Sequence, residues 1–348
     1  MAFLGLSGKV RHTFTHYGNS LLDKNYQEAL RRIREAKRSK ATELSLFGLK
    51  LTQLPPQLYQ LTQLESLSLS VNQLTDLPPR FSQLQQLQRL YLTNNQFQKF
   101  PLVICKLPNL KSLDLNNNQL SQLPLQISQL MHLKWLSVSS NQLQNLPPEI
   151  VQLPNLRWLD ANYNQLSNFP LFLTEMTQLE RLSWSSNRLG QLPPQISKLT
   201  RLQALDLSIN SLRNLPPQIG HLIHLESLGL DGNYLQYLPR EIGKLSLLQD
   251  FYLANNRLIE VPPEIGQLTE LRELSLDSNQ LTTLPREIAN LSQLTDLNLL
   301  YNDFKGVPES VLQHPPAKKI RMILAYQQKD LPKPLPKASR MLALQSAA

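Results

Sequence analysis

The chain has 348 residues, of which 41% are hydrophobic and 18% charged, with 25 prolines and only 11 glycines. This composition excludes a collagen-like or disordered chain and is typical of a folded protein with a large core. The single cysteine, Cys105, excludes an intrachain disulfide, and neither a signal-peptide core nor a run of about 20 apolar residues is present, so we expect a cytoplasmic protein.

The formal net charge of +9 is concentrated at the two ends of the chain. Residues 1–40 contain nine Lys or Arg and three Asp or Glu, and residues 305–348 contain eight and two. Residues 41–304 contain 18 basic and 21 acidic residues, so the body is slightly acidic. This distribution excludes a basic groove along the body, and nucleic-acid binding there is not expected.

The first 40 residues predict a flexible leader over 1–22 and a helix over 23–40. Helical spacing in NYQEALRRIREAKRSK, from Asn25 to Lys40, creates one apolar face, formed by Ala29, Leu30, Ile33 and Ala36. We expect this helix to cap the apolar end of the core that follows.

Residues 41–312 contain an internal repeat with a period of 23 residues. An asparagine marks each copy: Asn72, Asn95, Asn118, Asn141, Asn164, Asn187, Asn210, Asn233, Asn256, Asn279 and Asn302. Around it lies the pattern LxxLxLxxNxL, as in LKSLDLNNNQL, followed by a proline-containing segment such as LPPEIVQL. With the degenerate first copy, ATELSLFGLKL, the repeat predicts a solenoid of twelve turns.

The repeat also predicts the structure of one turn. Alternating leucines indicate a short strand with every second side chain in the core, and the proline-containing half returns the chain along the outside. The amide of each repeat asparagine has donors and an acceptor for backbone groups left unpaired where the chain leaves the strand, so we expect a structural ladder. Leu49 replaces it in the first turn, which predicts that the ladder ends there beneath an apolar cap.

This pattern resembles the leucine-rich repeat family, specifically the 23-residue class with LPxxIxxLxxL on its outer side that is common in intracellular signalling proteins. The resemblance covers residues 41 to about 312. It implies an α/β repeat solenoid, a horseshoe with a concave parallel β-sheet of about twelve turns and helical caps.

One core position departs from the aliphatic pattern in two adjacent turns. The sixth position of the repeat is Ala161 in one turn and Trp184 in the next. Because a small residue beside an oversized one conserves volume, we expect Trp184 to be buried in the core.

The third, fifth, seventh and eighth positions of the repeat face outward and contain the candidate partner-binding residues. Trp135 and Trp158 occupy the third position of adjacent turns, and near them lie Arg89, Tyr91, Asp160, Tyr163 and Arg181. Further along the face becomes acidic, with Asp206, Asp231, Asp250, Tyr252, Glu273 and Asp277. Since aromatic residues and arginine anchor interfaces, we expect a protein partner with an apolar element and a basic segment. The alternative is that the tryptophans only pack on each other and the acids form a solvated surface.

The C-terminal part predicts a second cap over 313–330 and a Pro- and Lys-containing tail over 331–348. The stretch AKKIRMILAYQQK follows Pro315 and Pro316, and its helical spacing creates an apolar face of Ile320, Ile323, Leu324 and Tyr326.

No motif for catalysis or cofactor binding is present: the sequence lacks HExxH, a cysteine pair and GxSxG. His221 and His224 are expected on the outer side without carboxylate or cysteine ligands. The string GLSGK, Gly5 to Lys9, lacks P-loop spacing. We therefore expect no enzyme, no cofactor, no metal and no small-molecule substrate.

A narrower resemblance concerns the ends of the repeat region. EALRRIREAKRSKATELSLFGLKLTQLPPQL, from Glu28 to Leu58, resembles the start of the repeat domain of bacterial Roco-type proteins, where leucine-rich repeats precede a Ras-like GTPase domain. The final KDLPKPLPKASRMLALQSAA is similar to the linker between the two. Because the P-loop motif is missing, the resemblance implies a related repeat module and no GTPase activity.

Together these patterns predict a non-enzymatic intracellular scaffold that binds a protein partner on its concave face in signalling. One alternative is a regulatory module that docks on a separate GTPase or kinase. Another is electrostatic attachment to a membrane or nucleic acid through the basic ends. Binding through the outer, glutamine-rich side also stays open.

Overall fold

A computed structural model describes residues 15–329, with side chains from 24 to 328. The string GLSGK, most of the expected leader and the expected tail over 331–348 lie outside the described residues. The chain consists of two compact units, the first ending at Arg188 and the second beginning at Leu189.

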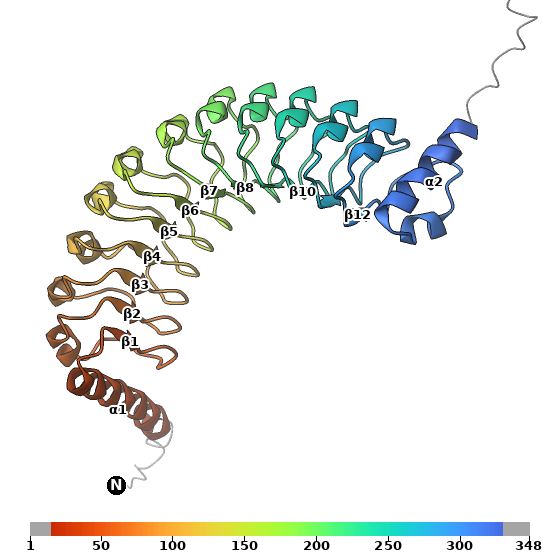
Figure 1. Ribbon diagram of the computed structural model, residues 1–348. Coiled ribbons are helices and arrows are strands. Elements are labelled where there is room, and N and C mark those ends of the chain that lie inside the picture. The colour runs from red at the N-terminus through yellow and green to blue at the C-terminus, as the bar shows by residue number, and fades with distance from the viewer. Residues whose placement is uncertain (1–14, 330–348) are drawn as a thin grey trace, which may run out of the picture. The chain divides into compact units, whose positions relative to one another are not determined.

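The first unit contains helix α1 and seven three-residue strands that pair in parallel, each with the next (Figure 1). The elements are α1 (Thr15–Ser39), β1 (Glu43–Ser45), β2 (Ser66–Ser68), β3 (Arg89–Tyr91), β4 (Ser112–Asp114), β5 (Trp135–Ser137), β6 (Trp158–Asp160) and β7 (Arg181–Ser183). Between the strands lie the 3₁₀ helices Pro56–Gln60, Pro79–Gln83, Leu102–Lys106, Leu125–Gln129, Pro148–Gln152 and Leu171–Glu175.

The second unit repeats this architecture with five parallel strands and ends in helix α2. Its elements are β8 (Ala204–Asp206), β9 (Ser227–Gly229), β10 (Asp250–Tyr252), β11 (Glu273–Ser275), β12 (Asp296–Asn298) and α2 (Pro316–Lys329). Its 3₁₀ helices are Pro194–Lys198, Pro217–His221, Arg240–Lys244, Pro263–Gln267, Arg286–Asn290 and Glu309–Gln313. The predicted repeat solenoid of parallel strands is therefore confirmed.

The core of each unit lies between its strands and its 3₁₀ helices, as the alternation of leucines predicts. The middle residue of each strand is buried, and the isoleucine or its equivalent in each 3₁₀ helix packs on the other side of the core. Trp184 is fully buried, as predicted, as is Ala161. The ring of Trp184 packs on Phe169 with centroids 5.7 Å apart.

The repeat asparagines form the predicted ladder. Asn141, for example, donates through Nδ2 to the carbonyl oxygens of Leu115 and Val138, both at 3.0 Å, and accepts from the backbone N–H of Leu120 at 2.9 Å. These bonds join consecutive turns and satisfy backbone groups that neither strand pairing nor water reaches. Leu49, which replaces the asparagine in the first turn, is buried as expected.

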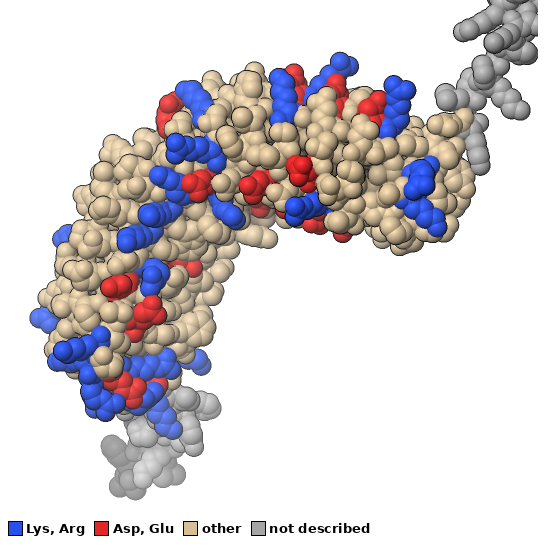
Figure 2. All heavy atoms as spheres, in the orientation of Figure 1, with Lys and Arg blue, Asp and Glu red and all other residues tan. Residues whose placement is uncertain are grey.

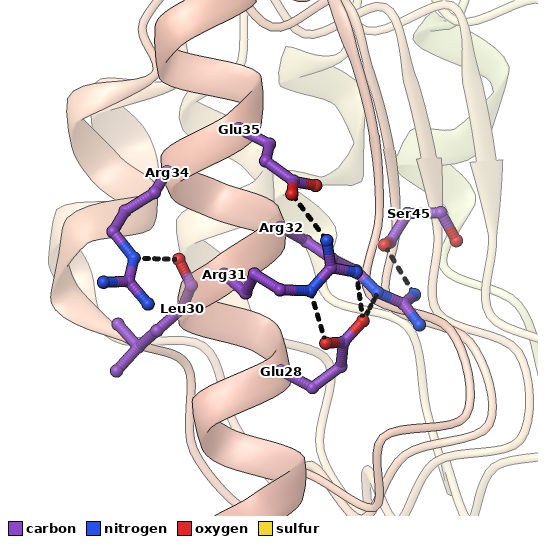
Figure 3. A network of polar contacts seen from close by, with 7 residues as sticks. All are labelled: Glu28, Leu30, Arg31, Arg32, Arg34, Glu35 and Ser45. Atoms are coloured by element: carbon purple, nitrogen blue, oxygen red, sulfur yellow. Dashed lines mark hydrogen bonds and ion pairs between the residues drawn. The ribbon is translucent and has the colours of Figure 1, made fainter.

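Helix α1 covers the β1 edge of the first unit. It begins at Thr15, inside the range expected for the leader, and its buried residues include Ala29, Ile33 and Ala36. Arg32 donates to Glu28 at 2.8 Å and to the carbonyl oxygen of Ser45 in β1 at 3.1 Å (Figure 3). A basic side chain of the cap helix thus satisfies a carbonyl group on the edge strand.

An ion-pair network on the exposed side of α1 supports this contact (Figure 3). Arg31 bridges Glu28, at 2.7 Å, and Glu35, at 2.5 Å. The hydrogen bonds from Arg31 and Arg32 lower the pKa of Glu28 to about 2. Glu28 therefore keeps its charge through the acidic range and holds Arg32 toward β1.

Helix α2 covers the other end of the repeat, which confirms the predicted C-terminal helical cap. Ile320 and Ile323 are buried, as their helical spacing predicts. Lys319 is also buried, and its Nζ donates to the carbonyl oxygen of Leu297 in β12. At both ends, therefore, a basic side chain of the cap helix donates a hydrogen bond to a carbonyl oxygen of the edge strand.

Candidate functional site

The aromatic patch, formed by Trp135, Trp158 and Arg181, lies on three neighbouring strands of the first unit. The three residues stand in register on β5, β6 and β7. The indoles meet edge to face with centroids 5.9 Å apart, and the Arg181 guanidinium lies 5.3 Å from the centroid of Trp158. The tryptophans do pack on each other, as one interpretation expected, but Trp158 remains 39% exposed. An aromatic surface preorganised by a cation–π contact is thus open to solvent.

The other candidate residues of the first unit are more dispersed. Arg89, on β3, forms an ion pair with Glu43 at 2.8 Å, and Tyr91 is half-buried on the same strand. Tyr163 follows β6 and is 59% exposed. The structure therefore brings Trp135, Trp158 and Arg181 into contact, whereas Arg89 and Tyr91 lie two strands from Trp135.

Asp160 has a structural role in addition to any binding role. Its Oδ1 accepts from the backbone N–H of Asn162 at 3.1 Å, and its Oδ2 accepts from the hydroxyl of Ser137 at 2.8 Å. Asp114 and Asp206 make the equivalent bond to the backbone two residues further on. These aspartates stand on alternate turns of the repeat, a longer periodicity that the single-turn pattern did not predict.

The acidic patch of the second unit is formed by Asp206, Asp231, Asp250, Tyr252, Glu273 and Asp277. The hydroxyl of Tyr252 donates to Glu273 Oε2 at 2.9 Å. Gly229 stands in register between Asp206 and Tyr252, and a Cβ there would lie 2.6 Å from Asp206 Oδ1, so any larger residue would require that carboxylate to move. The strand face, meaning the outward-facing side chains of the strands, therefore has a gap at Gly229, and acidic side chains surround this gap.

Asp231 is a half-buried carboxylate among the other acids of the acidic patch. Burial raises its pKa to about 6, opposed by a hydrogen bond from the backbone N–H of Ala254 and reinforced by the charges of Asp277, Asp206 and Glu273. Burial also raises the pKa of Tyr252 to about 12, together with its bond to Glu273 and the surrounding carboxylates. A cationic group placed here would relieve the mutual repulsion.

The remaining sequence candidates offer no reactive site. His221 and His224 are exposed on the outer side, and His224 Nδ1 lies 2.9 Å from the carbonyl oxygen of Thr200. Cys105 is buried, and burial raises the pKa of its thiol to about 11. Within residues 15–329, no cluster of three or more His, Cys, Asp or Glu side chains is arranged to hold a metal ion. No helix in that range is both long and apolar enough to cross a bilayer.

The outer flank of the first unit has a hollow that the sequence analysis did not single out. It measures about 600 Å³ and is lined by Leu77, Phe100, Leu102 and Val103, with Lys99 and Lys106. Leu102 is 53% exposed because it stands where most other turns have proline, arginine or glutamate at the start of the 3₁₀ helix. Leucine also begins the 3₁₀ helices at Leu125 and Leu171, both 58% exposed, so this position alone does not distinguish the hollow in the sequence.

The surface around the N-terminal cap helix is rich in basic side chains, as the charge of residues 1–40 predicts. Figure 2 shows Lys and Arg side chains gathered around α1, with Asp and Glu among them. The paired acids of the α1 network, Glu28 and Glu35, reduce the net positive charge there.

Comparison with known families and structures agrees with the geometry. The profile described as "Leucine-rich repeat region" matches residues 102–188 and 217–306, and one described as "Leucine rich repeat" matches 39–97 and 177–235. A leucine-rich repeat protein of Leptospira interrogans is 38% identical, with a TM-score of 0.74 over 80% of this chain and 69% of its own. The chain belongs to the leucine-rich repeat family. Proteins with this fold are generally scaffolds for protein–protein interaction, and typically not enzymes.

Two further solved structures have the fold of this leucine-rich repeat protein. The ectodomain of the Arabidopsis thaliana receptor kinase GASSHO1/SCHENGEN3, in complex with CASPARIAN STRIP INTEGRITY FACTOR 2, is 31% identical, with a TM-score of 0.60 over 72% of this chain and 37% of its own. An internalin of Listeria monocytogenes is 23% identical, with a TM-score of 0.67 over 81% of this chain and 89% of its own, and shows the shared fold. A search of curated proteins found no match.

Proposed function

We propose that this protein is a non-enzymatic scaffold of the cytoplasm that binds a protein partner on its strand face in signalling. The observation that carries the proposal is the aromatic patch, in which the 39% exposed indole of Trp158 is held by Trp135 and Arg181. Large, partly exposed aromatic side chains with restricted rotamers lose little entropy on binding, which favours their use as anchors.

The acidic patch supports a partner that carries a basic segment. Burial and the charges of Asp277, Asp206 and Glu273 raise the pKa of Asp231, and a lysine or arginine side chain would relieve this repulsion on binding. The complex of the receptor-kinase ectodomain with its named factor supports binding of a protein or peptide by the fold. A separate GTPase or kinase is one candidate for this partner. The resemblance to the 23-residue class and to Roco-type repeat domains favours it.

The test begins by capture of partners from a lysate of cells that produce the protein, followed by purification of each candidate and titration calorimetry. The variants are Trp135→Ala with Trp158→Ala, and separately Asp206→Asn with Glu273→Gln. Tyr301→Ala is the matched control because Tyr301 is an aromatic residue with 79% exposure outside both patches. Circular dichroism verifies that each variant is folded.

We expect the double tryptophan variant to bind about 30-fold more weakly, the loss typical of a central anchor. The acidic-patch variant should bind more weakly with a reduced dependence on salt concentration. Unchanged affinity in the tryptophan variant, with Tyr301→Ala also unchanged, would show that the strand face is not the interface.

A further inference from the structure

A polar hollow on the flank of the second unit is lined by two arginines, two side-chain amides and a tyrosine. It measures about 400 Å³, and its lining residues are Arg213, Asn214, Tyr234, Gln236 and Arg257. They come from three consecutive turns, just after the ladder asparagines. No carboxylate lines this hollow, although residues 41–304 as a whole are slightly acidic.

The two arginines are not neutralised by acidic neighbours. Within the described part of the chain, neither Arg213 nor Arg257 forms an ion pair, whereas Arg157 and Arg240 pair with glutamates. Two guanidinium groups around one hollow repel each other, and an anion between them removes that repulsion.

The residues that line the hollow differ from those at the same repeat positions in most other turns. Most turns place glutamine directly after the ladder asparagine, at Gln73, Gln96, Gln119, Gln142, Gln165 and Gln280. Four consecutive turns have another residue there, Arg188, Ser211, Tyr234 and Arg257, and the last two of these line the hollow. Because the repeat backbone accepts glutamine at this position elsewhere, folding does not require the arginine and tyrosine.

The lining is also preorganised. The backbone N–H of Tyr234 donates to Leu212 at 2.8 Å, and that of Arg257 donates to Leu235 at 2.9 Å, so the three flank segments are fixed relative to one another. The Arg257 guanidinium lies 4.6 Å from the centroid of the Tyr234 ring. Stacking restricts the arginine and leaves its N–H fork available for an acceptor.

We propose that this hollow binds a phosphoryl group. Two arginines match the double negative charge of a phosphate monoester and can donate to its oxygens in a forked geometry. Asn214, Gln236 and the Tyr234 hydroxyl add neutral donors for the remaining oxygens. The same chemistry recognises free phosphate and a phosphate ester carried by a larger molecule, and the two sources differ in whether contacts beyond the phosphate contribute.

The experiment is an NMR titration of the arginine Nε–Hε signals of the full chain at constant ionic strength, with inorganic phosphate in one arm and phenyl phosphate in the other. Arg257→Gln removes one fork, and Arg257→Lys keeps the charge but removes the planar fork. Arg201→Gln is the matched control, since Arg201 is also an exposed arginine of the second unit but does not line the hollow.

We expect saturable shifts of the Arg213 and Arg257 signals, with Arg201 unaffected and with at least about tenfold weaker binding in both Arg257 variants. Equal affinity for the two probes would indicate that the hollow recognises the phosphate group alone, as in free phosphate. Tighter binding of phenyl phosphate would indicate that its ligand is a phosphate ester of a larger molecule. Absence of saturation up to about 50 mM of either probe, or equal affinity in Arg257→Gln and the native protein, would overturn the proposal.

Discussion

The Oδ1 atom of Asp231 accepts a hydrogen bond from the backbone N–H of Ala254 at 2.6 Å. In the first unit, Asn116 and Asn162 make the same bond to Ser139, at 2.7 Å, and to Ser185, at 2.6 Å. A neutral amide therefore suffices for this contact. The negative charge of Asp231, in a half-buried position beside other acids, is not required by the fold and is consistent with selection for binding.

Asp231→Asn should stabilise the protein at pH 7.5 by about 1 kcal/mol. The folded-state pKa of Asp231, about 6, lies above its ordinary value of 3.8, so its contribution to stability is complete below pH 3.8 and is lost as the pH rises through 6. Solvent screening reduces the full linkage energy of such a shift to about 1 kcal/mol. Urea unfolding between pH 4 and pH 7.5 measures the change.

Glu226→Gln provides the control for Asp231→Asn because Glu226 is an exposed acid of the same turn. It should change the free energy of unfolding at pH 7.5 by less than about 0.5 kcal/mol. If Asp231→Asn destabilises the protein at pH 7.5, the negative charge of Asp231 has a structural role that the neutral amides of Asn116 and Asn162 cannot replace.

Ile209 occupies a left-handed backbone conformation, with φ of 52°, although it is β-branched and 54% exposed. Asn94, Asn117 and Asn255 occupy the same repeat position with similar φ. The left-handed region costs a β-branched isoleucine more conformational energy than it costs asparagine. Ile209→Asn should therefore raise the free energy of unfolding by about 1 kcal/mol. Thermal and urea denaturation test this. Ile223→Asn, at an isoleucine with 50% exposure outside the left-handed region, should give no such gain.

The strands, the core and the asparagine ladder could be predicted because one pattern of 23 residues repeats and each copy specifies the same contacts. Burial of Trp184 beside Ala161 followed from volume alone. These features depend on residues within a turn or one period away, and periodicity makes such contacts visible in the sequence.

The contacts that close the ends could not be predicted in the same way. Arg32 and Lys319 each bond a single carbonyl group of an edge strand, and neither residue belongs to the repeat. For the candidate site, the third repeat position predicted that Trp135 and Trp158 are neighbours. The stacking of Arg181 on Trp158 depends on a rotamer choice that the sequence does not specify.

Lys319→Met should destabilise the C-terminal end of the repeat by about 1 to 2 kcal/mol. The substitution keeps the apolar stem of the side chain but removes the donor to Leu297, leaving a carbonyl group of β12 unsatisfied. Hydrogen exchange should show faster exchange of β12 and α2 amides, with the first unit unchanged. Lys318→Met, at an exposed neighbour, is expected to alter neither region. Unchanged protection of β12 in Lys319→Met would mean that the apolar face of α2 alone closes this end.

Asn141→Ala should cost about 2 kcal/mol in the free energy of unfolding of the first unit. Asn141 is 8% exposed and satisfies the carbonyl oxygens of Leu115 and Val138 and the backbone N–H of Leu120. The two carbonyl oxygens keep a second donor, Asn118 Nδ2 for Leu115 and Asn164 Nδ2 for Val138, so alanine leaves the backbone N–H of Leu120 as the group without a partner. A buried group left without a partner costs roughly 1 to 3 kcal/mol. Urea unfolding provides the measurement, with Gln142→Ala as the exposed neighbour that should change stability by less than about 0.5 kcal/mol. A loss of similar size in both variants would show that the ladder contributes no more than an ordinary surface side chain.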